Sequence, residues 1–287
     1  MFSQEFYHTA QAVDWKSIKA PKRTAVLIQS EHILYGVGIP QTLCEDALAV
    51  RAAAKQGDTG QLRLRVVPET FYRFQDDGVA RIPAGLVERV DCALRSRQIT
   101  VEHVNQKAWP SLENAWKRLA NEKSSLPGEE LQRRIIFATR PRSHFQVRSV
   151  RQAAEILASA AAAFPKEPIH VIVKNKEVQS RLARSLQELG PVNVSTPESD
   201  PSYPSHKAVV ISCGQYFATE FTRTARLIVI VGADVAQTDT VTNNADVLNH
   251  VLRCCISIGE RSTGERGLMH IESLFGPKLD LSKMPSR

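Results

Sequence analysis

The chain has 287 residues, of which 43% are apolar and 23% are charged, and its 37 lysines and arginines against 30 acids give a formal net charge of +7. This composition is typical of a folded globular protein and excludes wholesale disorder. The length allows one large domain or two of medium size. Five cysteines without a CxxC spacing disfavour a disulfide-stapled secreted fold and a zinc ribbon, and they favour reduced thiols in the cytoplasm.

The sequence contains no convincing membrane segment or leader. Its longest nearly uncharged apolar stretch, Ala153–Phe164, contains Glu155 and is too short to span a bilayer. Met1–Ala10 carries Glu5 and His8 and lacks the apolar centre of a secretory signal. We therefore expect a cytoplasmic protein with no membrane partner.

The first part of the chain, residues 1–122, predicts a small α+β domain in which strands and helices are mixed. Alternating apolar and charged residues indicate half-buried strands, and Asp76-Asp77-Gly78 is a hairpin signal. In chain order the predicted elements are strands at Thr24–Gln29 and Ile33–Val37, a helix at Gln41–Lys55, a strand at Leu62–Val67, a hairpin from Phe71–Phe74 to Val79–Ile82, a helix from Pro83, a strand at Ile99–Val104 and a helix at Trp109–Asn121.

Residues 123–130 are polar and contain Pro127-Gly128, so they are the best candidate linker. Beyond them, residues 131–287 alternate apolar strands with helices, which predicts a parallel sheet covered by helices on both faces. The predicted elements are strands at Arg134–Thr139, Ile169–Val173, Val192–Ser195, Lys207–Cys213 and Arg226–Val231, and helices at Gln146–Phe164, Lys176–Leu189 and Ala245–Cys254.

The positive charge is concentrated in one window. Residues 1–130 hold 17 basic and 16 acidic residues, whereas residues 131–287 hold 20 and 14. Leu131–Ala154 contains six arginines and a histidine with no acid, and arginine pairs with phosphate in a bidentate manner. The window predicts either a polyanion-binding patch or a solvated face whose arginines pair with distant carboxylates. Its members are Arg133, Arg134, Arg140, Arg142, His144, Arg148 and Arg151.

A second candidate nucleic-acid surface lies in the first part of the chain, where aromatic and basic residues are interleaved. The aromatic side chains there could stack on bases, although alternation also allows some of them to be core residues. The residues concerned are the aromatics Phe71, Tyr72 and Phe74 and the arginines Arg63, Arg65 and Arg73.

The predicted strand ends lack the residues of a nucleotide site. Arg140–Phe145, which follows the strand predicted at Arg134–Thr139, has no glycine and no lysine, and a phosphate-binding loop needs both. After Ile228–Val231 the only acid is Asp234, where a Mg²⁺ ligand would be expected. The histidines are dispersed, so no metal is expected, and Cys254 and Cys255 are expected to be buried thiols.

The order of these segments resembles the first motor lobe of superfamily 2 helicases, the RecA-like DEAD/DEAH group. RIIFATR is similar to the strand leading into motif I, HVIVKNKEVQSRLARSLQ to motif Ia, KAVVISCGQY to the strand and turn that follow, and ARLIVIVGAD to the strand ending in D-E-x-H. ERSTGERGLMHIESLFGP resembles the stretch after motif III. The segment FYRFQDDGVARIPAGLVERVDCALRSRQITVE resembles a small domain that precedes the motor in repair-type members and contacts DNA.

The resemblance implies a RecA-like lobe preceded by a smaller α+β domain, with important departures from the family pattern. Val231–Asp234 stands where D-E-x-H would be, the motif I lysine and threonine are absent, and no second motor lobe follows. Without these groups phosphate binding, Mg²⁺ binding and water activation are all lost, so the resemblance implies no catalytic residue and no cofactor.

Three functions follow as hypotheses. The first is a non-catalytic nucleic-acid-binding or architectural subunit, binding DNA or RNA. The second is a protein scaffold inside a larger nucleic-acid machine, such as a defence, replication or virion complex, with protein partners. The third is an active ATPase or nuclease that depends on Asp234. The sequence favours the first.

Overall fold

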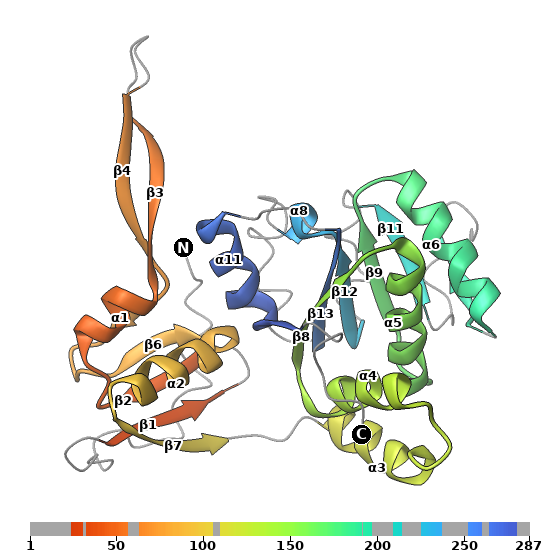
Figure 1. The fold of residues 1–287 in the computed structure, drawn as a ribbon, viewed down its shortest axis with the longest axis horizontal. Helices are drawn as coiled ribbons and strands as arrows, with labels where there is room; N and C mark the ends of the chain where they lie inside the picture. Colours follow the sequence, from red (N-terminus) through yellow and green to blue (C-terminus); the bar gives the residue numbers. More distant parts are fainter. Residues whose placement is uncertain are drawn as a thin grey trace. The chain divides into compact units, whose positions relative to one another are not determined.

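The computed structural model describes residues 24–30, 33–56, 63–105, 110–190, 192–196, 209–213, 225–236, 252–259 and 264–279, with the backbone alone at 51–68 and 105. The chain divides into two compact units, which we call unit 1 (Met1–Gln106) and unit 2 (Lys107–Arg287) (Figure 1). The division falls ahead of the helix that begins at Pro110, whereas the sequence predicted a linker at residues 123–130.

Unit 1 is built on a five-stranded sheet in the order β5-β6-β2-β1-β7, with a separate two-stranded ribbon of β3 and β4. All its strand pairs are antiparallel except β1 with β7. The elements are β1 (Thr24–Gln29), β2 (Ile33–Val37), α1 (Gln41–Ala47), β3 (Ala49–Gln56), β4 (Arg63–Thr70), β5 (Arg73–Phe74), β6 (Ala80–Pro83), a short 3-10 helix (Ala84–Leu86), α2 (Val87–Ser96) and β7 (Thr100–Asn105).

The hairpin predicted around Asp76-Asp77-Gly78 is confirmed as the β5–β6 turn. Gly78 takes a positive φ of 78°, which glycine adopts without strain, and the Asp77 carboxylate accepts a hydrogen bond from the Val79 amide at 3.1 Å. The helix predicted over Gln41–Lys55 ends at Ala47, and its second half is strand β3 instead. The alanines of β3 favour a helix, but pairing with β4 over eight positions decides the outcome.

Unit 2 contains a seven-stranded sheet in the order β10-β11-β9-β12-β13-β8-β14, and every pair in it is parallel. Helices α3 and α4 lie at one end of this sheet and α8 at the other (Figure 1). The elements are α3 (Pro110–Glu122), α4 (Gly128–Thr139), β8 (Arg142–Val147), α5 (Val150–Ala163), β9 (Ile169–Val173), α6 (Lys176–Leu189), β10 (Val194–Ser195), β11 (Val209–Cys213), β12 (Leu227–Val231), α8 (Ala233–Ala236), β13 (Leu252–Ile258), α11 (Glu265–Phe275) and β14 (Lys278–Leu279).

Each face of this sheet has its own apolar cluster. On one face, strand residues such as Val171 and Val229 pack with Leu157 of α5 and Leu182 of α6. On the other face, a smaller cluster joins strand residues to α8 and α11, with Phe275 fully buried. Parallel strands need cover on both faces, and the two clusters provide it, so the predicted α/β architecture is confirmed.

Two predicted elements of unit 2 are wrong. The segment Arg134–Thr139 is the last part of helix α4 rather than a strand, and the strand follows it at Arg142–Val147. The helix predicted over Ala245–Cys254 is contradicted at its end, because Leu252 begins strand β13; residues 245–251 lie outside the described part. The other strand and helix predictions in unit 2 are confirmed within a few residues, where described.

Within the described ranges, no helix is long and apolar enough to cross a membrane. The same ranges contain no group of three or more His, Cys, Asp or Glu side chains arranged to hold a metal ion.

Candidate nucleic-acid interface

The carboxyl ends of the parallel strands in unit 2 define where a ligand site is expected. From β9 the chain continues through α6 to β10 and β11 on one side, whereas from β12 it continues through α8 to β13 on the other side. Neighbouring strands whose connections leave in opposite directions create a crevice at their carboxyl ends. The crevice between β9 and β12 is therefore the first place to look for chemistry.

Two residues of opposite charge meet at this crevice. Lys174 follows β9, Asp234 lies just beyond β12, and the lysine ammonium forms an ion pair with the Asp234 carboxylate. Gly232 has a φ of 115°, and a Cβ at this position would lie 2.8 Å from Asp234 Oδ1, so only glycine fits beneath the carboxylate. The acid that follows β12, at the place where a motor of this kind would hold Mg²⁺, is thus engaged by an ammonium group.

We expect the Lys174–Asp234 pair to contribute little to stability. The two side chains are 56% and 36% exposed, so solvent screening should keep their coupling energy below about 1 kcal/mol. A double-mutant cycle of Lys174→Ala and Asp234→Ala, followed by chemical denaturation, measures this coupling. A coupling energy of several kcal/mol would contradict the screened geometry.

The connection from β8 to α5 consists only of Arg148 and Ser149. The Ser149 hydroxyl accepts a hydrogen bond from the Gln152 amide at 3.2 Å, and Gln152 Oε1 accepts one from the Arg148 amide at 2.7 Å. This reciprocal capping arrangement satisfies backbone donors at the start of α5 with the chain's own side chains. A Walker-type loop instead keeps such donors for phosphate and needs a longer connection.

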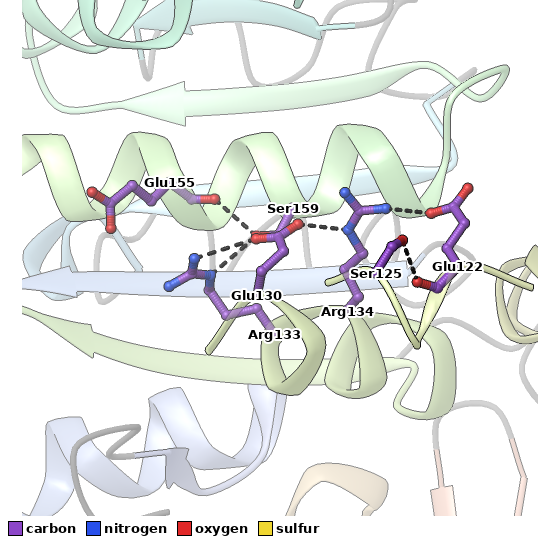
Figure 2. Close-up of polar contacts among 7 residues, drawn as sticks. All are labelled: Glu122, Ser125, Glu130, Arg133, Arg134, Glu155 and Ser159. Carbon is purple, nitrogen blue, oxygen red and sulfur yellow. Dashed lines mark hydrogen bonds and ion pairs between the residues drawn. The ribbon is translucent and has the colours of Figure 1, made fainter. Parts of the chain in front are cut away.

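Arg133 and Arg134 lie on α4 and form ion pairs with three glutamates, of which Figure 2 draws Glu122 and Glu130. Arg134 donates to Glu130 at 2.5 Å and to Glu122 at 2.7 Å. Arg133 donates to Glu130 at 3.2 Å and forms a longer ion pair of 3.8 Å with Glu129. Both arginines are largely covered, with 14% and 17% of their side chains exposed.

Glu130 is the centre of this network. Its carboxylate also accepts a hydrogen bond from the Ser159 hydroxyl of α5 at 2.6 Å, so it joins α4 to α5 (Figure 2). Burial alone would raise the pKa of Glu130, but the hydrogen bonds from Ser159 and Arg134 and the two arginine charges outweigh it and hold the pKa below its usual value. Arg133 and Arg134 therefore serve the packing of two helices.

Arg142 and His144 of β8 point into unit 2. Their exposed fractions are 8% and 2%. His144 Nε2 lies 2.7 Å from the Ser257 hydroxyl, and burial, with a smaller effect of Lys278, lowers the pKa of His144 to about 4. The sequence predicted these side chains at the surface, and this placement is wrong because β8 is an interior strand between β13 and β14.

Arg148 and Arg151 are the members of the window whose side chains are exposed. Arg148 makes no ion pair among the described residues, and Arg151 lies 3.6 Å from Glu188. Arg140 is half-buried at the opposite end of β8. The window therefore runs the length of a strand, about 20 Å for its six residues, and does not form one patch.

In unit 1, the arginines predicted beside the aromatics are only partly described. Arg73 of β5 is exposed, and Tyr72 and Phe74 form an edge-to-face ring pair with centroids 5.9 Å apart. Arg63 and Arg65 belong to strand β4, and their side chains lie outside the described part.

The cysteine predictions are confirmed where they can be compared. Cys254 and Cys255 are fully buried thiols, and burial raises the pKa of both, to about 12 for Cys255.

The sequence analysis did not single out Lys174 and Gln152. Lys174 follows β9 as Asp234 follows β12, so a comparison of strand ends would have found the first. The S-x-x-Q spacing of Ser149 and Gln152 is a capping-box signal that would have indicated the second.

The sheet order and flanking helices define unit 2 as a RecA-like α/β lobe, preceded by a smaller α+β unit. The chain is similar in structure to the UvsW helicase from bacteriophage T4, with a TM-score of 0.64 and 12% identity over 89% of this chain and 99% of that chain. A second structure, of T4 UvsW, gives a TM-score of 0.62 at 12% identity over 90% of this chain, which spans 57% of that longer chain. At this identity the likeness is one of fold.

No family model matches the sequence, and a comparison with curated proteins finds no match.

Proposed function

We propose that the protein is a non-catalytic nucleic-acid-binding or architectural subunit built on a helicase-like lobe. The observation that carries the proposal is the β8–α5 connection, where Ser149 and Gln152 occupy the backbone donors that a nucleotide phosphate would need. Exposed Arg148 and Arg151 stand at the same place. A site with exposed guanidinium groups but without free backbone amides for a nucleotide phosphate favours binding of a nucleic-acid backbone over nucleotide hydrolysis.

The Lys174–Asp234 ion pair supports the same proposal. A carboxylate that holds Mg²⁺ must be available to the metal, and here an ammonium group competes for it. The fold likeness to a protein described as a helicase also supports a nucleic acid as the ligand.

We expect binding to nucleic acid to weaken with salt in proportion to the number of phosphates contacted. If all six arginines of the window bound phosphates, log affinity against log salt would have a slope of roughly −5 on duplex DNA. Because Arg133, Arg134 and Arg142 are engaged inside unit 2, we expect a slope of about −3 or shallower from this window. Fluorescence anisotropy with labelled duplex DNA at several salt concentrations gives the slope.

The matched variants for this titration are Arg148→Gln with Arg151→Gln, and Arg181→Gln as a control. Arg181 is exposed on α6 and pairs with Glu177, so its loss removes the same charge elsewhere on unit 2. We expect the first pair of substitutions to reduce the slope by about 2 and the control to leave it unchanged. If the double variant and the Arg181 control changed the slope equally, Arg148 and Arg151 would not be phosphate-binding residues.

A scaffold in a larger nucleic-acid machine is the second candidate, and exposed apolar side chains favour it. Trp116 on α3 is 49% exposed and Ile135 on α4 is 37% exposed. Large exposed aromatic residues often anchor protein interfaces. Recovery of a stoichiometric protein partner from the native source after nuclease treatment would favour this function.

A further inference from the structure

The ribbon formed by β3 and β4 is a separate part of unit 1. Its strands are paired over eight positions, a length of about 27 Å. Among the sheets that the structure describes, these two strands pair only with each other (Figure 1). The base of the ribbon is anchored, because Val50 is buried and the Phe71 amide donates to the Leu48 carbonyl at 2.8 Å. Two strands alone are marginally stable in water, so a ribbon of this length indicates a binding element rather than part of a core.

The ribbon is basic beyond its base. The segments 51–56 and 63–68 pair with each other and contain three arginines, one lysine and no acid. The four cations are Arg51, Lys55, Arg63 and Arg65. Each lies opposite an uncharged residue of the other strand, in that order Pro68, Leu64, Gln56 and Ala54. The register therefore places no acid opposite any of these cations.

The register also divides the four cations between the two faces of the ribbon. Successive residues of a strand belong to opposite faces, and directly opposed residues of antiparallel strands share a face. Arg51 and Lys55 are four positions apart on β3, so they share one face. Arg65 lies opposite Ala54, the neighbour of Lys55, so Arg65 belongs to the other face together with Arg63. Each face thus carries two cations, and each pair comes from one strand.

Cations on both faces suit a groove between two anionic walls. A flat anionic surface would contact one face, whereas the two phosphate backbones of a duplex flank its groove on both sides. The major groove of B-form DNA is about 12 Å wide and admits a two-stranded ribbon, and the minor groove is only about 6 Å wide. A sheet layer occupies about 10 Å. Residues 52–54 are all alanine, which is depleted in strands but adds little bulk to the ribbon.

We propose that the β3–β4 ribbon enters the major groove of duplex DNA, and that each of its faces binds phosphates of a different backbone. Arg51 and Lys55 contact one backbone, and Arg63 and Arg65 contact the other. The proposal rests on the proposed function for a nucleic acid as ligand, and it narrows that ligand to a B-form duplex. The major groove of an A-form RNA duplex is deep and narrow, and a single strand has no groove, so both should bind less tightly.

The test is an anisotropy titration of the full chain with a labelled DNA duplex at several salt concentrations. Arg51→Gln with Lys55→Gln should make the salt slope shallower by about 1.8, because two phosphate contacts are lost. Arg63→Gln with Arg65→Gln should have an effect of the same size, and the quadruple variant should lose about 3.6. Arg63→Lys with Arg65→Lys keeps both charges and should keep the slope of the parent.

The matched control is Arg95→Gln with Lys117→Gln. Both cations are exposed, and each pairs with an acid four residues earlier on its own helix, Asp91 or Glu113. Their loss removes the same charge from outside the ribbon and should leave the slope unchanged. Circular dichroism checks that each variant is folded.

Competition with the parent chain needs no variant. Unlabelled duplex RNA and single-stranded DNA of the same sequence should each displace the labelled duplex at least about tenfold less well than unlabelled duplex DNA, because the contacts to at least one backbone are lost. Equal displacement would overturn the major-groove assignment. A slope that changes in only one of the two glutamine double variants would also overturn it, since that result would show docking of a single face.

The outcomes separate this site from the function on which it rests. If the parent chain binds no nucleic acid at low salt, the proposed function and the ribbon site fail together. If the parent binds duplex DNA and both glutamine double variants match the control, the proposed function stands and only the ribbon site is overturned.

Discussion

Replacing Glu130 with alanine should lower the free energy of unfolding of unit 2 by about 3 kcal/mol. The substitution leaves the guanidinium groups of Arg133 and Arg134 mostly covered but without their shared carboxylate, and it removes the acceptor of the Ser159 hydroxyl. Arg134 keeps Glu122 and Arg133 keeps the exposed Glu129. Loss of the carboxylate that the two largely covered guanidinium groups share still costs far more than an exposed pair contributes. Urea denaturation followed by far-ultraviolet circular dichroism measures the loss.

Glu129→Ala is the matched control for this prediction. Glu129 is the neighbouring residue of α4, is 90% exposed and lies 3.8 Å from Arg133. We expect its removal to change the free energy of unfolding by no more than about 0.5 kcal/mol. Similar losses at positions 129 and 130 would mean that the network joining α4 to α5 does not stabilise the fold as its geometry indicates.

Acid should destabilise unit 2 well before its carboxylates are protonated. Burial lowers the pKa of His144 and of His170 to about 4, whereas an unfolded histidine titrates near 6.5. Between these values the unfolded chain binds more protons than the folded chain, so stability rises with pH and is lost as pH falls. From pH 7 to pH 5 the loss is about 2 kcal/mol for each histidine.

Denaturation curves collected between pH 5 and pH 7 check this prediction. His170 Nε2 lies 2.5 Å from the Ser212 hydroxyl, and glutamine at positions 144 and 170 can offer a similar polar group without a charge change. The double variant His144→Gln with His170→Gln should therefore show a much flatter pH profile than the parent. A profile that keeps the parent's slope would contradict the placement of both rings inside the sheet.

The architecture could be predicted because apolar periodicity is a strong signal. Strand β9 and helix α6 were predicted to the residue, since an apolar run followed by a helical stripe has few other interpretations. Strand β8 was missed because its sequence, Arg142–Val147, is polar. Its polar side chains are buried on a face where Ser257 of β13 supplies a hydrogen-bond partner, and local sequence does not reveal a partner so distant along the chain.

The candidate site was harder to predict than the fold, for a related reason. The basic window contains no acid, but Glu129 and Glu130 lie just before it and Glu122 lies on the preceding helix. Once Arg134–Thr139 forms a helix rather than a strand, the i to i+4 spacing brings Glu130 against Arg134. A charge count along the sequence therefore overestimates the charge that reaches the surface.

The most direct test of the central claim is one binding titration of labelled nucleic acid, made at low and moderate salt, with and without Mg²⁺ and ATP. We predict binding at low salt that weakens as salt rises, that is the same with and without ATP at a fixed Mg²⁺ concentration and ionic strength, and that is accompanied by no ATP turnover. Absence of binding at low salt would contradict the claim. So would nucleic-acid-stimulated ATP hydrolysis that disappears in Asp234→Ala, which would identify an active motor instead.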